Sequence, residues 1–405
     1  MKTADHPIRI LRIINRMNVG GPSYNVAYLS KYLPNQYTTK VVSGMIEKDE
    51  ASSTYIFDEL GISYTFIHSM YRKISLLNDL KAFLTIRRII NEYKPHIVHT
   101  HAAKAGALGR LATIFSYHKS QLVLHTYHGN IFDGYFSPIK SRIFIFIEQF
   151  LAKYTHAIVS ISKTQKSDLV NKYAIAPDSK ISIIPLGFDL TKFLNITMED
   201  RYKIRQEFCI AEDRILVVIT GRLTAIKNHI FLLDVLADCK MRLGIKMTTL
   251  IVGDGELKEQ LFQYCTRLGL SYAEKKSING TEDVIFASWR KDIPAINAAS
   301  DICVLTSLNE GTPVSIIEAM ASAKPILATR VGGIEDFVED GISGMLSSLD
   351  VKEFSSKFDS LLSDSSLRFK MGQVARKSVE HKFSHSRLVS DMDSLYSSLL
   401  KEKYV

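Results

Sequence analysis

Cysteine is scarce in this sequence, as are long apolar runs. The 405 residues include four cysteines, and no two of them have the Cys-x-x-Cys spacing of a metal or redox site. We therefore expect unpaired thiols in the core of a protein from a reducing compartment. The four are Cys209, Cys239, Cys265 and Cys303.

Two targeting signals are also missing. No run of 18 uncharged apolar residues occurs, so we expect no membrane-spanning helix. The opening residues, "MKTADHPIRILRII", lack the apolar core and cleavage site of a signal peptide. These observations favour a cytoplasmic protein.

Basic side chains outnumber acidic ones, but only in the first half of the chain. The chain has a net charge of +9, and residues 1–190 carry 23 basic and 13 acidic side chains. A basic surface alone explains this distribution. An anionic partner, such as phospholipid, a phosphorylated substrate or nucleic acid, explains it equally well.

Short β-branched runs alternate with helical stretches along the whole chain, and the pattern restarts after "PLGFDLTKFLNITMED" at residues 185–200. Such alternation is typical of α/β units with mostly parallel sheets. We expect two domains, residues 1–190 and 191–385. A last helix, at about residues 386–405, follows the final strand.

Ligands of open parallel sheets bind at the carboxyl ends of the strands, and two loops there bear on phosphate binding. "NVGGPSYNV" offers Gly20 and Gly21, which allow close backbone approach, although a plain tight turn explains them as well. In "TGRLTAIKNH", Arg222 and Lys227 follow a buried-looking strand. Two cations there suit a diphosphate, and a solvated surface pair is the alternative.

A third loop, "NEGTPVSIIEAMA", places Glu310 and Glu318 on either side of a helix start near Thr312. The N–H groups of Gly311, Thr312 and the next residues lie at a helix N-terminus, which attracts an anion such as a diphosphate. The two carboxylates must then accept hydrogen bonds from hydroxyl groups, such as those of a sugar and a ribose.

Histidines and aspartates raise the question of a metal. His128 follows a strand in "HTYHGNIFDGYF", among aromatic residues that include Phe132 and Tyr135, and a structural role is the plain explanation. The spacings of the nearby histidines, at 99, 101 and 125, place them on mixed faces of their strands. The one Asp-x-Asp, at 391 and 393, is typical of a solvated helix face. We expect no metal site.

In combination and order, these motifs resemble the retaining glycosyltransferases of family four. "EGTPVSIIEAMASAKPILATRVGGIEDFVEDGISGML" is similar to the family's Glu-x7-Glu signature with its small-residue helix and Gly-Gly turn. "HGNIF", "PLGFDLTKF", "TGRLTAIKNH" and "IVGDGEL" match further elements. The resemblance covers nearly the whole chain. It implies a GT-B architecture, with two Rossmann-like domains facing a central cleft and a last helix that often crosses back to the first.

The resemblance also implies roles for individual residues. Arg222 and Lys227 would bind the donor diphosphate, together with the backbone of Gly21, Gly311 and Thr312. Glu318 would accept from the ribose, and Arg290 would contact the base. Glu310 would contact the transferred sugar, and His128 would lie at the reacting centre. No metal is required, because these groups stabilise the departing nucleoside diphosphate electrostatically.

The implied function is retaining transfer of a sugar from a nucleoside-diphosphate sugar to a saccharide or lipid-linked acceptor in surface polysaccharide or glycolipid synthesis. Many family members carry a different sequence after "EG", so "TPVS" puts the donor sugar in doubt. A sugar-nucleotide 2-epimerase of the same fold is the alternative, and a nucleic-acid-binding protein would leave both glutamates unexplained.

The basic half suggests contact with an anionic membrane. "FSPIKSRIFIFIEQFLAKY" combines basic side chains with a long apolar stripe, and as a core helix it needs no membrane. As a peripheral anchor at the inner face of the cytoplasmic membrane, it would carry Lys140, Arg142 and Lys153 at the interface.

Overall fold

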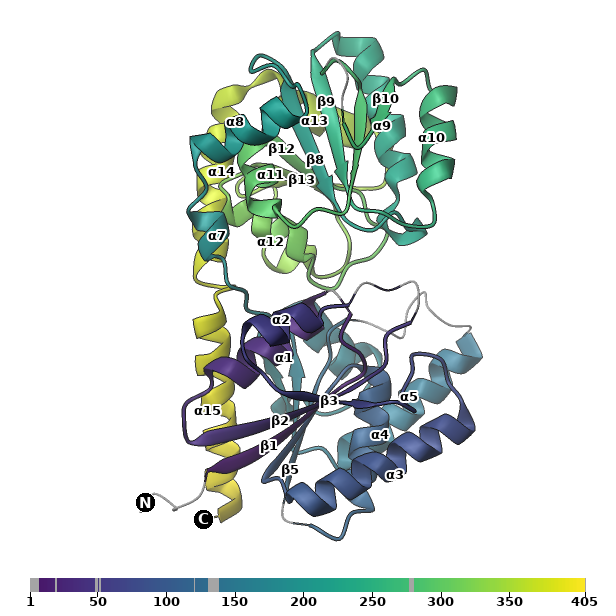
Figure 1. Ribbon diagram of the computed structural model, residues 1–405, viewed down its shortest axis with the longest axis vertical. Helices are drawn as coiled ribbons and strands as arrows, with labels where there is room; N and C mark the ends of the chain where they lie inside the picture. Colours follow the sequence, from purple (N-terminus) through teal and green to yellow (C-terminus); the bar gives the residue numbers. More distant parts are fainter. Residues whose placement is uncertain are drawn as a thin grey trace. The chain divides into compact units, whose positions relative to one another are not determined.

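The protein folds into two compact units that are both α/β. The computed structural model describes residues 7–18, 20–47, 50, 52–119, 121–129, 138–276 and 280–404. One unit consists of residues 1–188 and 383–405, and the other of residues 189–382 (Figure 1). Within the described residues, no helix is both long enough and apolar enough to cross a bilayer.

The sheet of the first unit is wholly parallel among the described strands. The inner strands of this sheet consist mostly of buried residues, many of them β-branched, as expected for strands that are covered on both faces. In spatial order the strands are β3 (Tyr64–Ile67), β2 (Tyr37–Gly44), β1 (Ile8–Ile14), β4 (Ile97–His101), β5 (Leu122–Thr126), β6 (Ala157–Ser160) and β7 (Ile181–Ile183).

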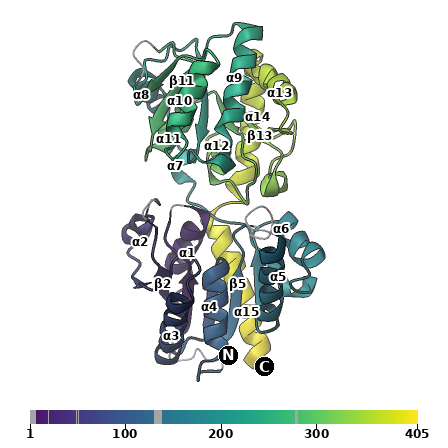
Figure 2. The ribbon, with the colours of Figure 1, turned by 90° about the vertical axis from the view of Figure 1, so that its right-hand side faces the viewer.

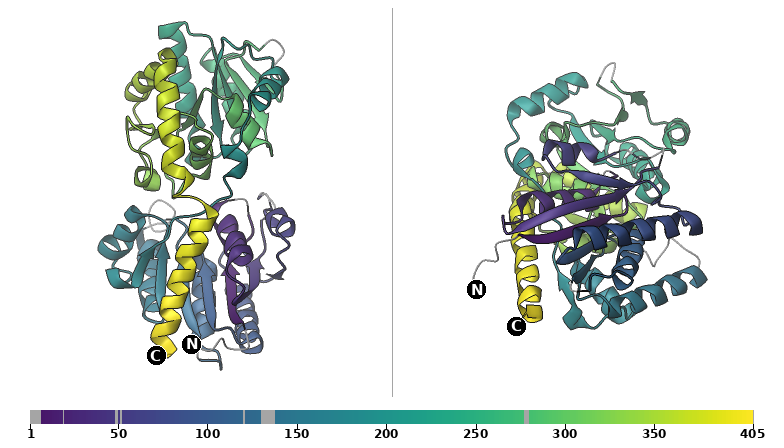
Figure 3. Two further views of the ribbon diagram at one scale, coloured as in Figure 1. Left: turned by 90° about the vertical axis from the view of Figure 1, so that its left-hand side faces the viewer. Right: turned by 60° about the horizontal axis from the view of Figure 1, so that its bottom comes forward.

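Helices cover both faces of this sheet. On one face α3, α4 and α5 lie side by side as a single layer (Figure 2). On the other, α1 and the last helix, α15, pack together (Figure 3). The helices are α1 (Gly21–Tyr32), α2 (Thr54–Glu59), α3 (Leu76–Tyr93), α4 (Ala103–Ile114), α5 (Pro138–Lys153), α6 (Lys163–Ser167) and α15 (His385–Tyr404).

The second unit repeats this plan with its own parallel sheet. The spatial order is β10 (Tyr272–Glu274), β11 (Val284–Ser288), β9 (Met247–Val252), β8 (Ile215–Thr220), β12 (Ile302–Leu305), β13 (Ile326–Thr329) and β14 (Met345–Ser347). Its helices are α7 (Thr191–Leu194), α8 (Met198–Glu207), α9 (His229–Leu243), α10 (Lys258–Arg267), α11 (Ile293–Ala299), α12 (Val314–Ala321), α13 (Val351–Ser363) and α14 (Ser365–Glu380).

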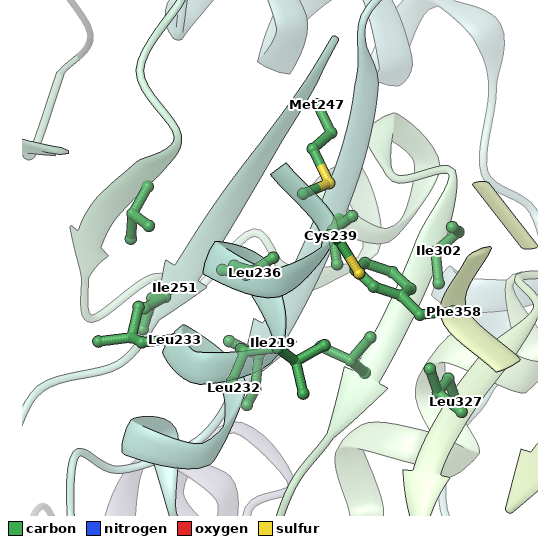
Figure 4. Close-up of a cluster of buried hydrophobic side chains, with 14 of the residues drawn as sticks. Ile219, Leu232, Leu233, Leu236, Cys239, Met247, Ile251, Ile302, Leu327 and Phe358 are labelled. Carbon is green, nitrogen blue, oxygen red and sulfur yellow. The ribbon is translucent and has the colours of Figure 1, made fainter. Parts of the chain in front are cut away.

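The core of the second unit lies between one face of this sheet and helices α9, α10 and α13. Leu232 and Leu236 of α9 pack with Phe358 of α13 over Ile219 and Ile251 of the central strands (Figure 4). All five side chains are buried, and each fully buried aliphatic or aromatic side chain contributes about 1.5–3 kcal/mol. This packing holds the strand ends, and therefore the loops after them, in fixed positions.

The predicted α/β class with parallel sheets is confirmed. The expectation of four core thiols holds for three cysteines but is wrong for Cys209, which is exposed. It follows α8 with a φ of 55°, at the turn where that helix ends. At this turn the neighbouring Phe208 and Ile210 are buried, and the side chain between them faces solvent.

Candidate functional site

The strand order of the second unit creates a switch point between β8 and β12. From β8 the chain proceeds outward through β9 and β11, and it then returns to add β12, β13 and β14 on the other side. The loops after β8 and β12 therefore diverge, which leaves an opening at the carboxyl ends of the strands. Both phosphate-binding motifs predicted for this unit lie in these two loops.

An ion pair joins the two loops. The Lys227 ammonium donates to Glu310, with 2.5 Å between Nζ and Oε1, and both side chains are mostly buried. The Ser307 hydroxyl donates to the same carboxylate oxygen at 2.6 Å. Glu310 is thus held in one orientation by two donors. The sequence motifs gave no sign of the Ser307 contact.

Two hydrogen bonds to backbone carbonyls hold the same loops together near this ion pair. The Thr306 hydroxyl donates to the carbonyl of Lys227 at 3.0 Å, and the N–H of Leu308 donates to the carbonyl of Ile226 at 2.8 Å. Each such bond adds about 0.5–1.5 kcal/mol. These bonds therefore hold the two loops, and with them the ion pair, in place before a ligand binds.

Glycines allow the neighbouring loop to approach the Glu310 backbone. Gly332 has a φ of +57°, and a Cβ there would lie 1.8 Å from the carbonyl oxygen of Glu310. Gly333 is restricted by contact alone, because a Cβ there would lie 2.2 Å from the carbonyl oxygen of Gly311, and its N–H donates to the backbone carbonyl of Glu310 at 3.2 Å. The Gly-Gly turn of the family signature is therefore a packing requirement of the Glu310 loop.

Helix α12 begins at Val314, directly after Gly311, Thr312 and Pro313. The first N–H groups of a helix have no intrahelical acceptor and carry partial positive charge, so they attract an anion. Arg222, in the loop after β8, is exposed, and none of the described residues pairs with its guanidinium. The helix start and Arg222 give this edge of the sheet cationic character.

Glu318 lies one turn further along α12, in a different environment. Its side chain is half-buried, and no hydrogen bond to its carboxyl group occurs among the described residues. Burial raises the pKa of Glu318 to about 8, so the unliganded carboxyl group is protonated at neutral pH. Glu310 and Glu318 are therefore not equivalent.

Arg290 is occupied by other residues of its own unit. Its guanidinium donates to both carboxylate oxygens of Glu207, at 2.5 and 2.9 Å, and to both of Asp292, at 2.9 and 2.6 Å. These two carboxylates raise the pKa of Arg290. The base contact expected for Arg290 stays a prediction, and the structure gives this side chain a second task in holding α8 to the loop after β11.

In the first unit, His128 lies against His101. Their rings stack, and His101 Nδ1 is 3.1 Å from His128 Nε2. Burial lowers the pKa of His128 to about 3, which keeps the imidazole neutral. His128 Nδ1 is buried without a partner among the described residues. The aromatic residues named after it, Phe132 and Tyr135, lie outside the described residues, as does the rest of "NIF" in the His-Gly element.

The neighbouring histidines divide over both faces of the sheet. His99 accepts at Nδ1 from Arg12, at 3.1 Å, and lies 2.6 Å from the Tyr396 hydroxyl of α15. His125 instead lies 2.9 Å from the Thr100 hydroxyl. In the described part of the chain, no three His, Cys, Asp or Glu side chains are grouped to hold a metal ion.

Gly21 is the first residue of α1 and directly follows Gly20, whose φ is 156°. Val19, in the same motif, lies outside the described residues.

The Asp-x-Asp of α15, Asp391 and Asp393, was expected to lie on a solvated helix face. That expectation is wrong for the second aspartate. Asp393 accepts from the Tyr37 hydroxyl at 2.8 Å and so attaches α15 to β2.

Comparison with known proteins identifies the class. The family model "Glycosyl transferases group 1" matches residues 200–378, and "Glycosyltransferase Family 4" matches residues 19–192. Together the two models cover most of the chain. This protein belongs to the group 1 glycosyltransferases of family 4, and it is therefore a transferase, as the motifs predicted.

Individual relatives are distant but nearly full length. The chain is 27% identical over 361 residues, 89% of both chains, to the UDP-Gal:α-D-GlcNAc-diphosphoundecaprenol α-1,3-galactosyltransferase of Escherichia coli. It is 26% identical to the putative glycosyltransferase EpsD of Bacillus subtilis, over 81% of this chain and 84% of that one.

A solved structure shares the fold. The crystal structure of Anabaena Alr3699/HepE in complex with UDP matches with a TM-score of 0.79 and 21% identity, over 96% of this chain and all of that one. The architecture is therefore GT-B, which confirms the predicted fold.

Proposed function

We propose that this enzyme transfers a sugar from a nucleoside-diphosphate sugar to a hydroxyl group of a saccharide or lipid-linked acceptor, with retention of the anomeric configuration. The reaction would serve surface polysaccharide or glycolipid synthesis. The observation that carries the proposal is the Lys227–Glu310 pair, which stands at the β8/β12 switch point beside a helix N-terminus.

The donor fits this edge of the sheet by its chemistry. Its diphosphate would take the α12 N–H groups, Arg222 and Lys227, and its ribose hydroxyls would donate to Glu318. Glu310, held by Lys227 and Ser307, is an acceptor for the hydroxyls of the transferred sugar. A bound UDP in the Anabaena structure supports a uridine donor.

Catalysis would consist of stabilising the departing nucleoside diphosphate. Arg222, Lys227 and the N–H groups at the start of α12 would face the position where negative charge develops, and Lys227, which is already held by Glu310, would need little reorganisation during the reaction. We prefer a same-face displacement, in which a donor phosphate oxygen takes the proton of the acceptor hydroxyl. His128 is neutral, so it would act as a hydrogen-bonding group and not as an imidazolium acid. We expect transfer to persist in EDTA.

The acceptor is proposed from a relative. The Escherichia coli enzyme acts on a sugar linked to diphosphoundecaprenol, and the basic first half of this chain suits such an anionic, membrane-borne substrate. We propose action at the inner face of the cytoplasmic membrane.

A thermal-shift screen with nucleoside diphosphates and their sugars tests donor binding, because a ligand of the folded state raises the unfolding temperature. The donor that is found is then incubated with and without a synthetic polyprenyl-diphosphate sugar. NMR of the product's anomeric proton reports the configuration. Inversion would overturn retention, and rapid change of the donor without acceptor would identify an epimerase.

A further inference from the structure

The outer face of α5 is apolar where a solvated helix is normally charged. Ile139, Ile143 and Phe146 are 73%, 54% and 70% exposed, and Ile147, Phe150 and Tyr154 continue the same face. Exposed apolar side chains are ordinary when single, but a contiguous stripe marks an interaction surface.

The charges on this face of α5 have one sign. Lys140, Arg142 and Lys153 are exposed among the apolar residues. The one acidic residue of the helix, Glu148, is buried and paired with Arg110. The outer face of α5 is therefore apolar and purely cationic.

Helix α3 carries a second stripe of the same kind, which the sequence motifs did not indicate. Leu76, Leu77, Leu80 and Leu84 are exposed, the first two by 86% and 76%. Basic residues also flank this stripe at exposed positions, namely Arg72, Lys73 and Lys81.

The two acidic residues of α3 do not cancel these charges. Asp79 is paired with Lys104 at 2.6 Å, and Glu92 with Arg88 at 2.8 Å. Each acid is therefore offset by a cation outside the flanking set.

The two stripes belong to one layer of helices. Helix α4 packs between α3 and α5 on one face of the sheet (Figure 2), and it has no exposed residue along its length. Helices α3 and α5 are therefore more exposed than the helix between them. The apolar and basic residues of α3 and α5 form a single surface, which we call the α3–α5 face.

We propose that the α3–α5 face docks on an anionic phospholipid bilayer. Aromatic and aliphatic side chains between basic ones are the signature of a helix that lies in the membrane interface, with its apolar side among the acyl chains and its cations at the headgroups. A water-soluble protein partner with the opposite charge would also need an apolar surface of matching shape, whereas a bilayer supplies both properties over any area.

This proposal rests on the proposed function, since it gives an enzyme with a lipid-linked acceptor a reason to be at the membrane. It deepens that function by naming the surface. The interaction is peripheral, in accord with the absence of a helix long and apolar enough to cross a bilayer among the described residues.

Flotation of the full chain with phosphatidylcholine vesicles, with and without phosphatidylglycerol, tests the proposal. We expect the protein to float with anionic vesicles at low salt and to be released as salt rises. Phe146→Ser, Leu77→Ser, and the pair Arg142→Glu with Lys153→Glu should each reduce the bound fraction, the charge reversal by about tenfold or more.

Matched controls come from α14 of the second unit. Phe369 is 68% exposed, almost as much as Phe146, and Lys370 and Lys377 are exposed on the same helix. Phe369→Ser, and the pair Lys370→Glu with Lys377→Glu, should leave flotation unchanged. Circular dichroism and the unfolding temperature establish that each variant is folded.

Three results would overturn the proposal. The first is that the natural chain does not float at low salt. The second is that the α3 and α5 variants float as well as the natural chain. The third is that the natural chain is a dimer that does not bind vesicles and that Phe146→Ser dissociates. Failure here is separable from failure of the proposed function. A donor-induced thermal shift without flotation would contradict only the docking surface, and flotation without any donor-induced shift would contradict only the proposed transfer reaction.

Discussion

The Lys227 ammonium lies 2.5 Å from the Glu310 carboxylate, although 83 residues separate them in the chain. The two residues lie in the loops that follow β8 and β12, the two strands that border the switch point. In the unliganded enzyme they neutralise each other. We expect a donor that uses both residues to place its phosphate near the Lys227 ammonium and its sugar hydroxyls near the Glu310 carboxylate.

The first prediction concerns the two members of this pair. Glu310→Gln should preserve the fold and nucleoside-diphosphate binding but lower kcat by about a hundredfold, because it removes a charged acceptor at the reacting sugar. Lys227→Ala should weaken nucleoside-diphosphate binding itself. Steady-state kinetics and calorimetric titration with the diphosphate separate the two effects.

Carrying both changes in one chain supplies the control. The effects of substitutions at two residues in direct contact are not additive. The double variant should therefore lose less free energy of transition-state stabilisation, measured from kcat/KM, than the sum of the losses in the two single variants. Full additivity would mean that the contact has no energetic consequence.

A second prediction concerns the Gly-Gly turn. Gly332→Ala places a Cβ against the Glu310 carbonyl at a backbone φ of +57°, so it should destabilise the second unit by about 1–3 kcal/mol and displace Glu310. Gly341→Ala is the matched variant, because its φ is +77° and no atom lies within 4 Å of its Cβ. It should cost only the backbone strain and retain activity. Equal loss of turnover in both variants would count against the packing role.

The third prediction follows from the pKa of Glu318. In the proposed complex, donor hydroxyls would stabilise the ionised carboxylate of Glu318, whereas burial raises its pKa to about 8 in the unliganded enzyme. Donor binding at pH 7 should therefore release a proton. Calorimetry in buffers of different ionisation enthalpy measures it, and Glu318→Gln should abolish the release. An unchanged proton count in that variant would assign the proton to another group.

Glu318 also has a consequence for stability. Its ordinary pKa is 4.5, so between pH 4.5 and about 8 the folded chain holds a proton that the unfolded chain has lost. Its contribution to the free energy of unfolding therefore decreases as pH rises through this window. Glu318→Gln should flatten that decrease in chemical denaturation followed by the fluorescence of Trp289, the single tryptophan and a residue of the second unit.

The fourth prediction concerns the histidines of the first unit. Burial lowers the pKa of His99, His101 and His125 well below 6.5, and that of His128 to about 3. Their contribution to stability is complete above pH 6.5 and is lost as pH falls below it, because the unfolded chain then binds the protons. Protection factors for amide hydrogen exchange in β4 and β5, which correct for the slower intrinsic exchange at low pH, should therefore decrease between pH 6.5 and 4. A pH-independent rate of local opening would contradict this expectation.

Much of the fold was predictable because each strand is marked by a local pattern. Five strands of the second unit coincide with β-branched runs that end at or just before Gly, Ser or Thr, and the helix after Glu310 begins within two residues of the expected Thr312. Such features depend on neighbours in the sequence. The short edge strands β3 and β10 escaped, because four and three residues carry too little periodicity.

The contacts of the site were less predictable. The position of Glu310 in the loop was evident, but its pairing with Lys227 and Ser307 depends on which strands are adjacent. The two carboxylates beside Arg290 and the hydroxyl that Tyr37 offers to Asp393 are likewise tertiary facts. The α3 stripe was also missed, because a row of leucines in a helix looks like a core-facing row until the burial of each side chain is known.

Helix α15 contributes Leu388, Met392 and Tyr396 to the core of the first unit, beside Ile10 and Leu124. The unit that begins the chain is therefore completed by its last residues. During synthesis, residues 189–382 form an uninterrupted unit that has everything it needs to fold first. The opening 188 residues emerge earlier, and part of one sheet face stays uncovered until α15 has been synthesised, so a chain that stops before α15 exposes a hydrophobic surface to chaperones.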